Sequence, residues 1–150
     1  MIHVERVEAA MVLPLRGAIL RPGLPLAQAA YPEDDDPANL HLAALDESGH
    51  VVGCCTWLPE PWEGRPAWRL RGMATDPGVR GSGVGGALIR RGLDEAVVAG
   101  AEVVWCNART VALGFYRHFG FETVGEEFLT QQQIPHYVMW CELGQVRSSG

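Results

Sequence analysis

A glycine-rich turn between a predicted strand and a predicted helix is the feature that most constrains this chain. Residues 68–88 read WRLRGMATDPGVRGSGVGGAL, an apolar strand, a break at Asp76-Pro77-Gly78, and then a helix. Four of the six residues 81–86 are glycine, so no Cβ blocks the approach of a ligand to the backbone. The opening turn of a helix leaves N–H groups without acceptors and carries the positive end of the helix dipole. With the charge of Arg80 beside it, this turn predicts a phosphate-binding site.

Composition indicates the class of protein in which that site lies. The chain has 150 residues, 47% of them hydrophobic, and a formal net charge of −6. This length predicts one domain with its own core, which we place at residues 1–143, followed by a disordered tail at 144–150. The acidic balance argues against a nucleic-acid partner. The sequence shows no run of 18 apolar residues and no secretory leader, so no membrane partner and a cytoplasmic location are expected.

The four cysteines do not predict a metal site. Cys54, Cys55, Cys106 and Cys141 show no CxxC spacing and no histidine at ligand spacing. Cys54 and Cys55 would point to opposite faces of a strand, so they could not easily share a metal ion. Buried, reduced thiols and no metal are therefore expected.

Hydrophobic periodicity and turn residues divide the chain into strands and helices. Strands are predicted at residues 2–6, 40–45, 51–58, 68–75, 103–106, 121–124, 127–129 and 137–143. Helices are predicted at residues 8–20, 82–99 and 111–119, with Thr110 as the N-cap of the last helix and Gly100 and Gly120 as C-terminal stops. The strand–helix–strand unit in the second half requires a parallel pair, and the earlier hairpin an antiparallel one. The fold class is therefore α/β or α+β, with a mixed sheet and helices on both faces.

The segment between the first helix and the second strand is predicted to be an irregular loop, residues 22–39. Its acidic run, Glu-Asp-Asp-Asp at 33–36, is expected to be a solvated face of the protein.

Two other phosphate-binding patterns fit the glycine-rich turn less well. Gly81-x-Gly83-x-x-Gly86 matches the dinucleotide fingerprint, but the acid expected about 20 residues later would be Glu102. Glu102 precedes a predicted strand, whereas the ribose-binding acid belongs at the end of one. A Walker-type loop would need Gly-Lys followed by Ser or Thr, which the turn lacks.

Two motifs, in the right order, resemble the GNAT superfamily of N-acetyltransferases, whose members bind acetyl-coenzyme A. The first is Arg80-x-x-Gly83-x-Gly85 after a strand, which is similar to the pyrophosphate-binding loop of that superfamily. The second is VWCNARTVALGFYRHFGF at residues 104–121, which is similar to its strand–Asn–helix–Phe-Tyr–Gly-Phe segment. The resemblance covers residues 40–143, and it implies a GNAT-like fold with a splayed central sheet and acetyl-CoA as the cofactor.

The resemblance also implies how acetyl-CoA would bind. In that fold the strand before the phosphate loop parts from the strand after it, and Gly72 suits the bulge or the close backbone approach that begins the separation. The pantetheine arm would then pair with the backbone of Met73, Ala74 and Thr75. The other cofactor-binding residues that the resemblance implies are Arg80, Gly81, Ser82, Gly83, Val84 and Gly85 at the pyrophosphate, Asn107 at the pantetheine, and Tyr116.

The same resemblance implies the catalytic residues. The Met73 N–H would stabilise the oxyanion, and Tyr116 would protonate the leaving thiolate, as in the superfamily's Phe-Tyr-x-x-x-Gly-Phe pattern. Some relatives carry a glutamate base where this chain has Arg69, which cannot accept a proton at physiological pH. A water relay, His41 and His136 are the alternatives for the base, and Glu126 and Glu127, in a loop predicted to border the same side, are further candidates. His136 is assigned to the site because the segment before the last strand would reach the substrate side.

Two arginines leave the charge of the acceptor open. Arg71 stands on an otherwise apolar strand, where a charge is unfavourable unless it is paired. Arg71 and Arg16 would either bind an anionic acceptor or form salt bridges with carboxylates of the chain.

The sequence therefore predicts an N-acetyltransferase that moves an acetyl group from acetyl-CoA to a primary amine of a small molecule or peptide. The alternative is a non-catalytic acyl-CoA sensor of the same fold, which the absent strand glutamate keeps open. The sequence does not define the acceptor amine, the length of the acyl chain or the oligomeric state. A homodimer through the last strands is a common arrangement in such folds.

Overall fold

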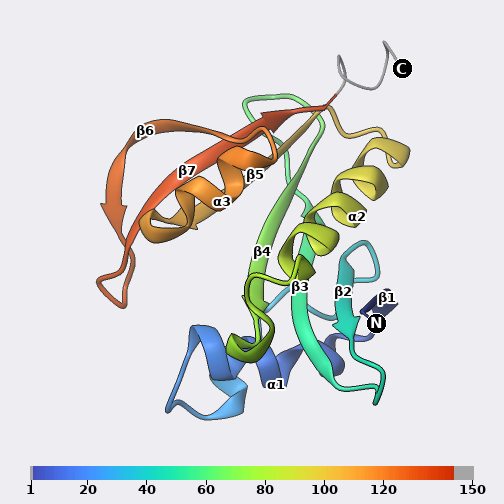
Figure 1. Ribbon diagram of the computed structural model, residues 1–150. Helices are drawn as coiled ribbons and strands as arrows, with labels where there is room; N and C mark the ends of the chain where they lie inside the picture. Colours follow the sequence, from blue (N-terminus) through green and yellow to red (C-terminus); the bar gives the residue numbers. More distant parts are fainter. Residues whose placement is uncertain (1, 144–150) are drawn as a thin grey trace. The chain divides into compact units, whose positions relative to one another are not determined.

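The computed structural model describes residues 2–143, which form seven strands and three α-helices (Figure 1). The strands are β1 His3–Val7, β2 Leu40–Leu45, β3 Val51–Pro59, β4 Ala67–Thr75, β5 Val103–Arg109, β6 Glu122–Leu129 and β7 Pro135–Glu142. The helices are α1 Ala9–Leu20, α2 Val84–Val98 and α3 Leu113–His118, with 3-10 turns at Leu26–Ala29, Pro77–Val79 and Thr110–Ala112. The sheet has the order β1-β2-β3-β4-β5-β7-β6 and contains parallel and antiparallel pairs, which confirms the predicted mixed α/β class. The predicted tail lies outside the described residues.

The chain forms two compact units. Of the described residues, the first unit contains 2–58 and 71–92, and the second contains 59–70 and 93–143. The division falls within two elements. The first four residues of β4 belong to the second unit and the last five to the first. The part of α2 up to Gly92 belongs to the first unit, and the rest belongs to the second.

In the first unit, two helices cover opposite faces of an antiparallel meander formed by β1, β2 and β3. Gly53 and Cys54 are neighbours on β3 and therefore point to opposite faces. On one face, Cys54 packs in a buried cluster with Val12 of α1 and Ala74 of β4. On the other face, a Cβ added to Gly53 would lie 2.6 Å from the Val84 side chain of α2. Within this unit the prediction of helices on both faces is confirmed.

The close approach of α2 to β3 depends on Gly92, where a Cβ would lie 2.0 Å from two ring atoms of the fully buried Trp57. We expect Gly92→Ala to lower the free energy of unfolding by about 2 kcal/mol or more, because overpacking outweighs the better helix propensity of alanine. Urea unfolding followed by tryptophan fluorescence measures the change. Gly114→Ala in α3, where an added Cβ meets nothing within 4 Å, is the matched control. Equal unfolding midpoints for the two variants would contradict the expectation.

In the second unit, β4 and β5 are parallel, as the strand–helix–strand pattern predicts. Their register runs from Ala67↔Val103 to Leu70↔Cys106. β5 pairs antiparallel with β7 along its whole length, and β7 pairs antiparallel with β6. α3 covers one face of this part of the sheet, with the Phe119 carbonyl 3.9 Å from the Cys141 Sγ of β7.

Two predicted strand boundaries were wrong. β5 does not end at residue 106 but continues to Arg109, because Asn107, Ala108 and Arg109 each have a register partner on β7. The two short strands predicted at residues 121–129 are one strand, β6, whose register with β7 shifts between Val124 and Phe128. Gly125 lies in that irregularity with a φ of +77°, a conformation that glycine adopts without strain.

The starts of two helices also differ from the prediction. α2 begins at Val84 rather than at residue 82, because Gly81 and Gly83 both have positive φ and keep the chain in a turn. Thr110 is not the N-cap of α3, since α3 begins at Leu113 after a 3-10 turn. The Thr110 hydroxyl instead donates to the Glu127 carboxylate at 2.7 Å.

Candidate active site

The predicted phosphate-binding turn lies in the first unit, between the end of β4 and the start of α2. Asp76 begins it by accepting the Gly78 N–H at 2.8 Å. Gly81 and Gly83 have φ of +84° and +88°, a left-handed conformation that is unfavourable for other residues. A Cβ on either glycine would meet no other atom within 4 Å, so the space beside the turn is open. Glycine is needed here for its backbone conformation, and the turn is accessible to a ligand.

The start of α2 supplies hydrogen-bond donors to this turn. The bond that closes the first helical turn runs from the Ala87 N–H to the Gly83 carbonyl at 3.0 Å. The N–H groups of Val84, Gly85 and Gly86 precede that bond, where a helix offers no acceptor of its own. Together with the helix dipole, these donors attract a phosphate group. The backbone here therefore fits a phosphate group.

Arg80 and Ser82 use part of their bonding capacity within the turn. The exposed Arg80 donates from Nη2 to the Thr75 carbonyl at 3.3 Å, which connects the turn to the end of β4. The Ser82 hydroxyl donates to the Val79 carbonyl. Arg80 keeps further guanidinium N–H groups for an anion, since an arginine has five donors.

The backbone of β4 departs from regular strand geometry at Gly72, which has a φ of +66°. A Cβ at this position would lie 2.8 Å from Arg16 Nε and 3.4 Å from the Tyr31 hydroxyl. This agrees with the prediction that Gly72 marks a close approach on β4. The next residues are the half-buried Met73 and Thr75, with the buried Ala74 between them.

A buried ion pair fills the space beside Gly72. Arg16 is 1% exposed, and its guanidinium donates to Asp34 Oδ2 at 2.8 Å and to Asp34 Oδ1 at 3.2 Å. The same group donates to the Ala29 carbonyl and to Thr56 Oγ1. Burial raises the pKa of Asp34, but hydrogen bonds from Arg16 and from the Tyr31 N–H, together with nearby positive charge, lower it further than burial raises it. The prediction that residues 33–36 form a solvated face was therefore wrong for Asp34.

The charge of Arg71 is also neutralised by a carboxylate, although this pair is more exposed than Arg16 and Asp34. Its guanidinium forms a salt bridge with Glu33 and lies over the Tyr31 ring, 3.7 Å from the ring centroid. Arg16 lies over that ring too, at 4.0 Å. Cations over an aromatic ring are attracted by its quadrupole. Of the two alternatives for Arg16 and Arg71, the geometry favours salt bridges over binding of an anionic acceptor.

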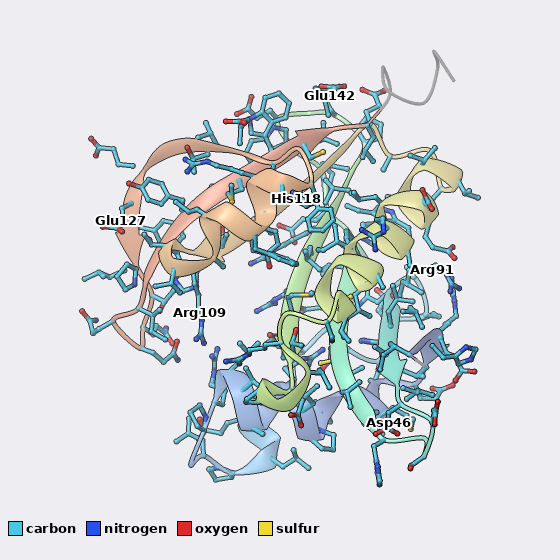
Figure 2. The ribbon with its side chains drawn as sticks, viewed as in Figure 1. Asp46, Arg91, Arg109, His118, Glu127 and Glu142 are labelled. Atoms are coloured by element: carbon cyan, nitrogen blue, oxygen red, sulfur yellow. The ribbon has the colours of Figure 1, made fainter. Side chains whose placement is uncertain are left out.

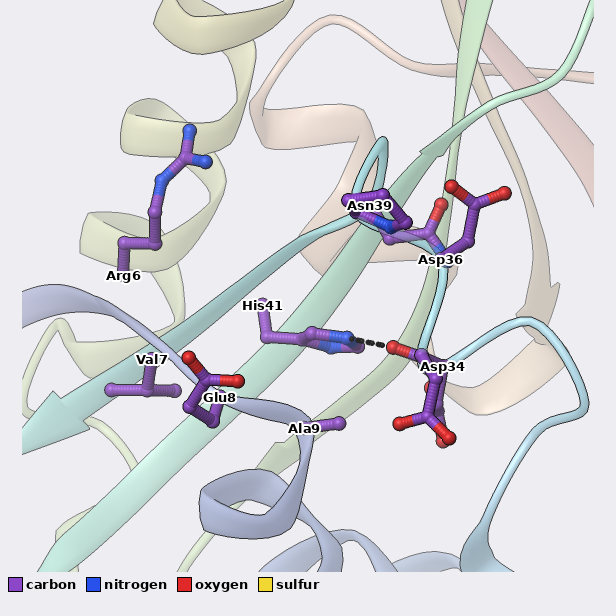
Figure 3. Close-up of a pocket in the computed structure, with 10 residues that line it drawn as sticks. Arg6, Val7, Glu8, Ala9, Asp34, Asp36, Asn39 and His41 are labelled. Atoms are coloured by element: carbon purple, nitrogen blue, oxygen red, sulfur yellow. Dashed lines mark hydrogen bonds between the residues drawn. The ribbon is translucent and has the colours of Figure 1, made fainter.

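His41, one of the alternatives for the general base, is bonded through both ring nitrogens. Its Nε2 donates to the Asp34 carbonyl at 2.9 Å, as Figure 3 shows, and its Nδ1 lies 2.8 Å from Thr56 Oγ1. A carbonyl only accepts, so Nε2 carries the proton and Nδ1 accepts from the Thr56 hydroxyl. His41 is 6% exposed. These two bonds hold the His41 ring between Asp34 and Thr56. They leave no ring lone pair that could accept a proton from an incoming amine.

A pocket of about 510 Å³ lies in the first unit beside His41. It is lined by Arg6, Val7, Glu8 and Ala9 at the β1–α1 junction, and by Asp34, Asp35, Asp36, Pro37, Asn39 and His41 (Figure 3). Apart from His41, which is one of the alternatives for the base, the lining contains no residue that the sequence assigns to the site. None of the predicted cofactor-binding residues lines this pocket, so it is not the predicted acetyl-CoA site.

The second unit brings the predicted residues Asn107 and His136 onto one face of the sheet. In the β5–β7 register, Asn107 is opposite Val138 and Arg109 is opposite His136. Residues two apart on a strand, and residues directly opposite on neighbouring strands, share a face. Asn107 is exposed, whereas Arg109 and His136 are half-buried. Arg109 was not selected from the sequence, because its place opposite His136 depends on a strand predicted to end at residue 106.

His136 is the histidine whose geometry suits a base. Its Nδ1 donates to the Ile134 carbonyl at 2.8 Å, so the neutral ring carries its lone pair on Nε2. The ring stacks on Phe128 of β6, with 5.8 Å between the ring centroids and 30° between the planes. The carbonyl and the phenyl ring together fix the orientation of the imidazole.

Tyr116 lies on α3 with its ring packed between other aromatic side chains. It makes edge-to-face contacts with Phe115 at 5.1 Å and with Phe121 at 5.5 Å between ring centroids. The side chain is 7% exposed. Phe121 belongs to the same Phe-Tyr–Gly-Phe motif, so the motif builds the aromatic packing that holds the phenol.

Arg69 occupies the position where some relatives carry a glutamate. Its guanidinium lies over the Trp105 ring at 5.0 Å and donates to Glu60 Oε1 at a long 3.5 Å. Trp105 in turn donates from Nε1 to the Glu60 carbonyl at 3.0 Å. Glu60, which follows β3, places its carboxylate beside Arg69 of β4. The sequence pattern did not predict this neighbour.

The four cysteines are buried and form no disulfide. Burial raises the pKa of Cys54 to about 11 and that of Cys106 to about 12. It also raises the pKa of Cys55 and of Cys141. Thiols in this state are poor nucleophiles. Within residues 2–143, no three histidine, cysteine or acidic side chains gather closely enough to hold a metal ion.

Comparison with known proteins agrees with this geometry. A sequence profile of the acetyltransferase (GNAT) family matches residues 12–121. The uncharacterized N-acetyltransferase YitI of Bacillus subtilis (strain 168) is 31% identical over 146 residues, which cover 95% of this chain and 97% of YitI. Among solved structures, Escherichia coli ElaA has a TM-score of 0.73 at 20% identity, covering 95% of this chain and 100% of ElaA. A chain in the crystal structure of the NatC complex bound to Gag peptide and CoA has a TM-score of 0.78 at 17% identity, covering 95% and 99%.

The family match, together with these structures, defines the fold as that of the GNAT acyl-CoA N-acyltransferases. The chain belongs to the acetyltransferase (GNAT) family, and its activity is that of an N-acetyltransferase. No helix of residues 2–143 has the length and apolar character needed to span a bilayer.

Proposed function

We propose that the chain transfers an acetyl group from acetyl-CoA to a primary amine of a small molecule or peptide. The observation that carries this proposal is the turn at Gly81 and Gly83, whose open, positive-φ backbone leads into the donors of α2. Arg80 would add its charge to the diphosphate, and the backbone of Met73, Ala74 and Thr75 would pair with the pantetheine arm. Asn107 would contact the same arm from β5.

The chemistry would be divided among three groups of the chain. The amine nitrogen bonds to the acetyl carbonyl carbon, and the Met73 N–H donates to the oxygen that becomes negative. His136 Nε2, or a water molecule, accepts the proton that the nitrogen loses. The carbon–sulfur bond then breaks, and Tyr116 donates a proton to the departing sulfur. Binding both substrates together supplies the remaining acceleration through proximity.

The proposal is tested by two measurements on the full chain. Isothermal titration with acetyl-CoA measures binding, and an assay of free CoA thiol across a panel of primary amines measures transfer. We expect micromolar binding and amine-dependent thiol release. Binding without release for every amine class would favour the acyl-CoA sensor instead, and absence of binding would contradict the assignment of the turn.

Substitution of the turn glycines tests the diphosphate site directly. In Gly83→Ala, a left-handed φ costs about 1–2 kcal/mol for a non-glycine residue, and relief of that strain would turn the N–H donors away. We expect the Kd for CoA to rise about tenfold, which corresponds to about 1.4 kcal/mol. The control is Gly49→Ala in the β2–β3 hairpin, where φ is +85° and the surrounding space is equally open. An equal loss of CoA affinity in both variants would mean that strain alone, and not the site, is responsible.

A further inference from the structure

Arg109 is a half-buried arginine whose side chain has no hydrogen-bond or ion-pair partner within residues 2–143. Two other half-buried arginines, Arg21 and Arg91, donate to the backbone carbonyls of Leu20 and Val4. Three more have carboxylate partners. These pairs are Arg65 with Glu142, Arg69 with Glu60, and Arg71 with Glu33. A charge partly removed from water without a partner is unfavourable, so Arg109 stands out as a half-buried cation for which residues 2–143 supply neither a counter-charge nor another acceptor.

A nearby carboxylate is engaged elsewhere. Glu127 on β6 accepts the hydroxyl hydrogen of Thr110, the residue that follows Arg109, at 2.7 Å. No ion pair within 4.0 Å joins Glu127 to Arg109. The guanidinium therefore keeps its full set of donors, in a planar arrangement that matches the two oxygens of a carboxylate.

The position of Arg109 places this cation beside the proposed base. It is directly opposite His136 in the β5–β7 register, two residues beyond Asn107 on the same face. α3 covers the other face, which carries the buried residues Cys106 and Ala108. In Figure 2, Arg109 lies at the end of β5 with its side chain directed away from the α3 ribbon. Directly opposite residues have Cβ atoms about 4.5–5.5 Å apart, so one small molecule can reach both side chains.

We propose that the acceptor amine carries a carboxylate, as an α-amino acid does, and that Arg109 binds this carboxylate. The inference rests on the proposed function and specifies its substrate class. An α-amino acid has its amine and its carboxylate on one carbon, a separation that suits two neighbouring side chains. The carboxylate pairs with the Arg109 guanidinium, and the amine faces Nε2 of His136. The alternative anion-binding residues, Arg16 and Arg71, are already paired with Asp34 and Glu33.

The test compares the standard amino acids with their C-terminal amides as acceptors in the thiol-release assay. We expect transfer to one or more amino acids, with kcat/KM for the matching amide at least about 30-fold lower, because one partner of a charge pair is missing. In Arg109→Gln, the KM for the amino acid should rise by a similar factor, while the KM for acetyl-CoA stays unchanged. Arg109→Lys should recover part of the loss, since it restores the charge without the planar fork. Arg117→Gln, an exposed arginine on α3, is the control and should match the wild type.

Other outcomes separate the inference from the proposed function. Equal transfer to acids and amides, transfer only to amines without a carboxylate, or a rise in the KM for acetyl-CoA alone in Arg109→Gln would each overturn the inference and leave acetyl transfer intact. If no amine accepts acetyl, the proposed function fails. The inference is then judged by the binding of N-acetyl amino acids and their amides in titration calorimetry. Carboxylate-dependent binding that disappears in Arg109→Gln would support it, and its absence would overturn it.

Discussion

Tyr116→Phe is expected to lower kcat by about 100-fold or more, because a positioned general acid contributes factors of this size to a proton transfer. The substitution removes only the phenolic oxygen. The edge-to-face contacts of the ring with Phe115 and Phe121 are available to phenylalanine as well. We therefore expect the Kd for acetyl-CoA and the unfolding midpoint to change little. Steady-state thiol release, titration calorimetry and urea unfolding measure the three quantities.

The matched control for this prediction is Tyr137→Phe, the same chemical change on a half-buried tyrosine of β7. Tyr137 has no assigned role, so its variant should keep wild-type turnover. If Tyr116→Phe also keeps wild-type turnover, Tyr116 is not the proton donor. A parallel loss of turnover and of stability would assign Tyr116 to aromatic packing alone.

Asp34→Asn is expected to destabilise the protein by about 3–5 kcal/mol, because it leaves the buried Arg16 guanidinium without a counter-charge. In the double variant Arg16→Met/Asp34→Leu, the loss of stability should be smaller than the sum of the losses in the single variants Arg16→Met and Asp34→Leu. Urea unfolding of the two single variants and the double variant measures this coupling. Asp35→Asn, at the exposed neighbouring position, is the control. Additive effects of the two single substitutions would contradict a direct interaction of the pair.

The pH dependence of stability provides an independent check of this pair. Burial raises the pKa of Asp34 and the contacts with Arg16 and Tyr31 lower it more, so its net shift is downward. A carboxyl group with a lowered pKa stabilises the folded state above its unfolded pKa, about 3.9, and that stability is lost as the pH falls through the folded pKa. We expect the wild type to lose stability below about pH 4, and Asp34→Asn to lose less over the same range. Parallel curves for the two proteins would rule out this contribution.

The glycine-rich turn could be predicted from the sequence because its determinants are local. A turn that needs positive φ at Gly81 and Gly83 followed directly by a helix is encoded within a few residues. The same holds for Gly72 and for the ends of α2 and α3, where Gly100 and Gly120 have φ of +89° and +92°. Sequence alone was sufficient to predict these features, because in each of them the identity of one residue determines the conformation of its own backbone.

The charge pairs could not be predicted, because their partners are far apart in the sequence. Arg16 and Asp34 are 18 residues apart, and Arg71 and Glu33 are 38 apart. A run of acidic residues usually faces solvent, so the pattern at residues 33–36 indicated exposure. Only the tertiary structure shows that two neighbouring acids of this run bind two different arginines.

The extent of β5 was missed for a related reason. Asn107 and Arg109 are polar, and a polar residue after an apolar run usually marks the end of a strand. In the structure the ladder with β7 carries the strand three residues further. This extension places Arg109 opposite His136, so the proposed substrate class depends on pairing between strands and not on any sequence motif.

The buried state of the four cysteines has a practical consequence for enzymology. A reagent such as Ellman's disulfide reacts with thiolates, and in the folded protein every cysteine is buried with a raised pKa. The colour that develops during a reaction should therefore report released coenzyme alone, with a negligible blank from the enzyme. Addition of a denaturant should reveal the four thiols at once, so the same reagent also titrates the fraction of molecules that have unfolded.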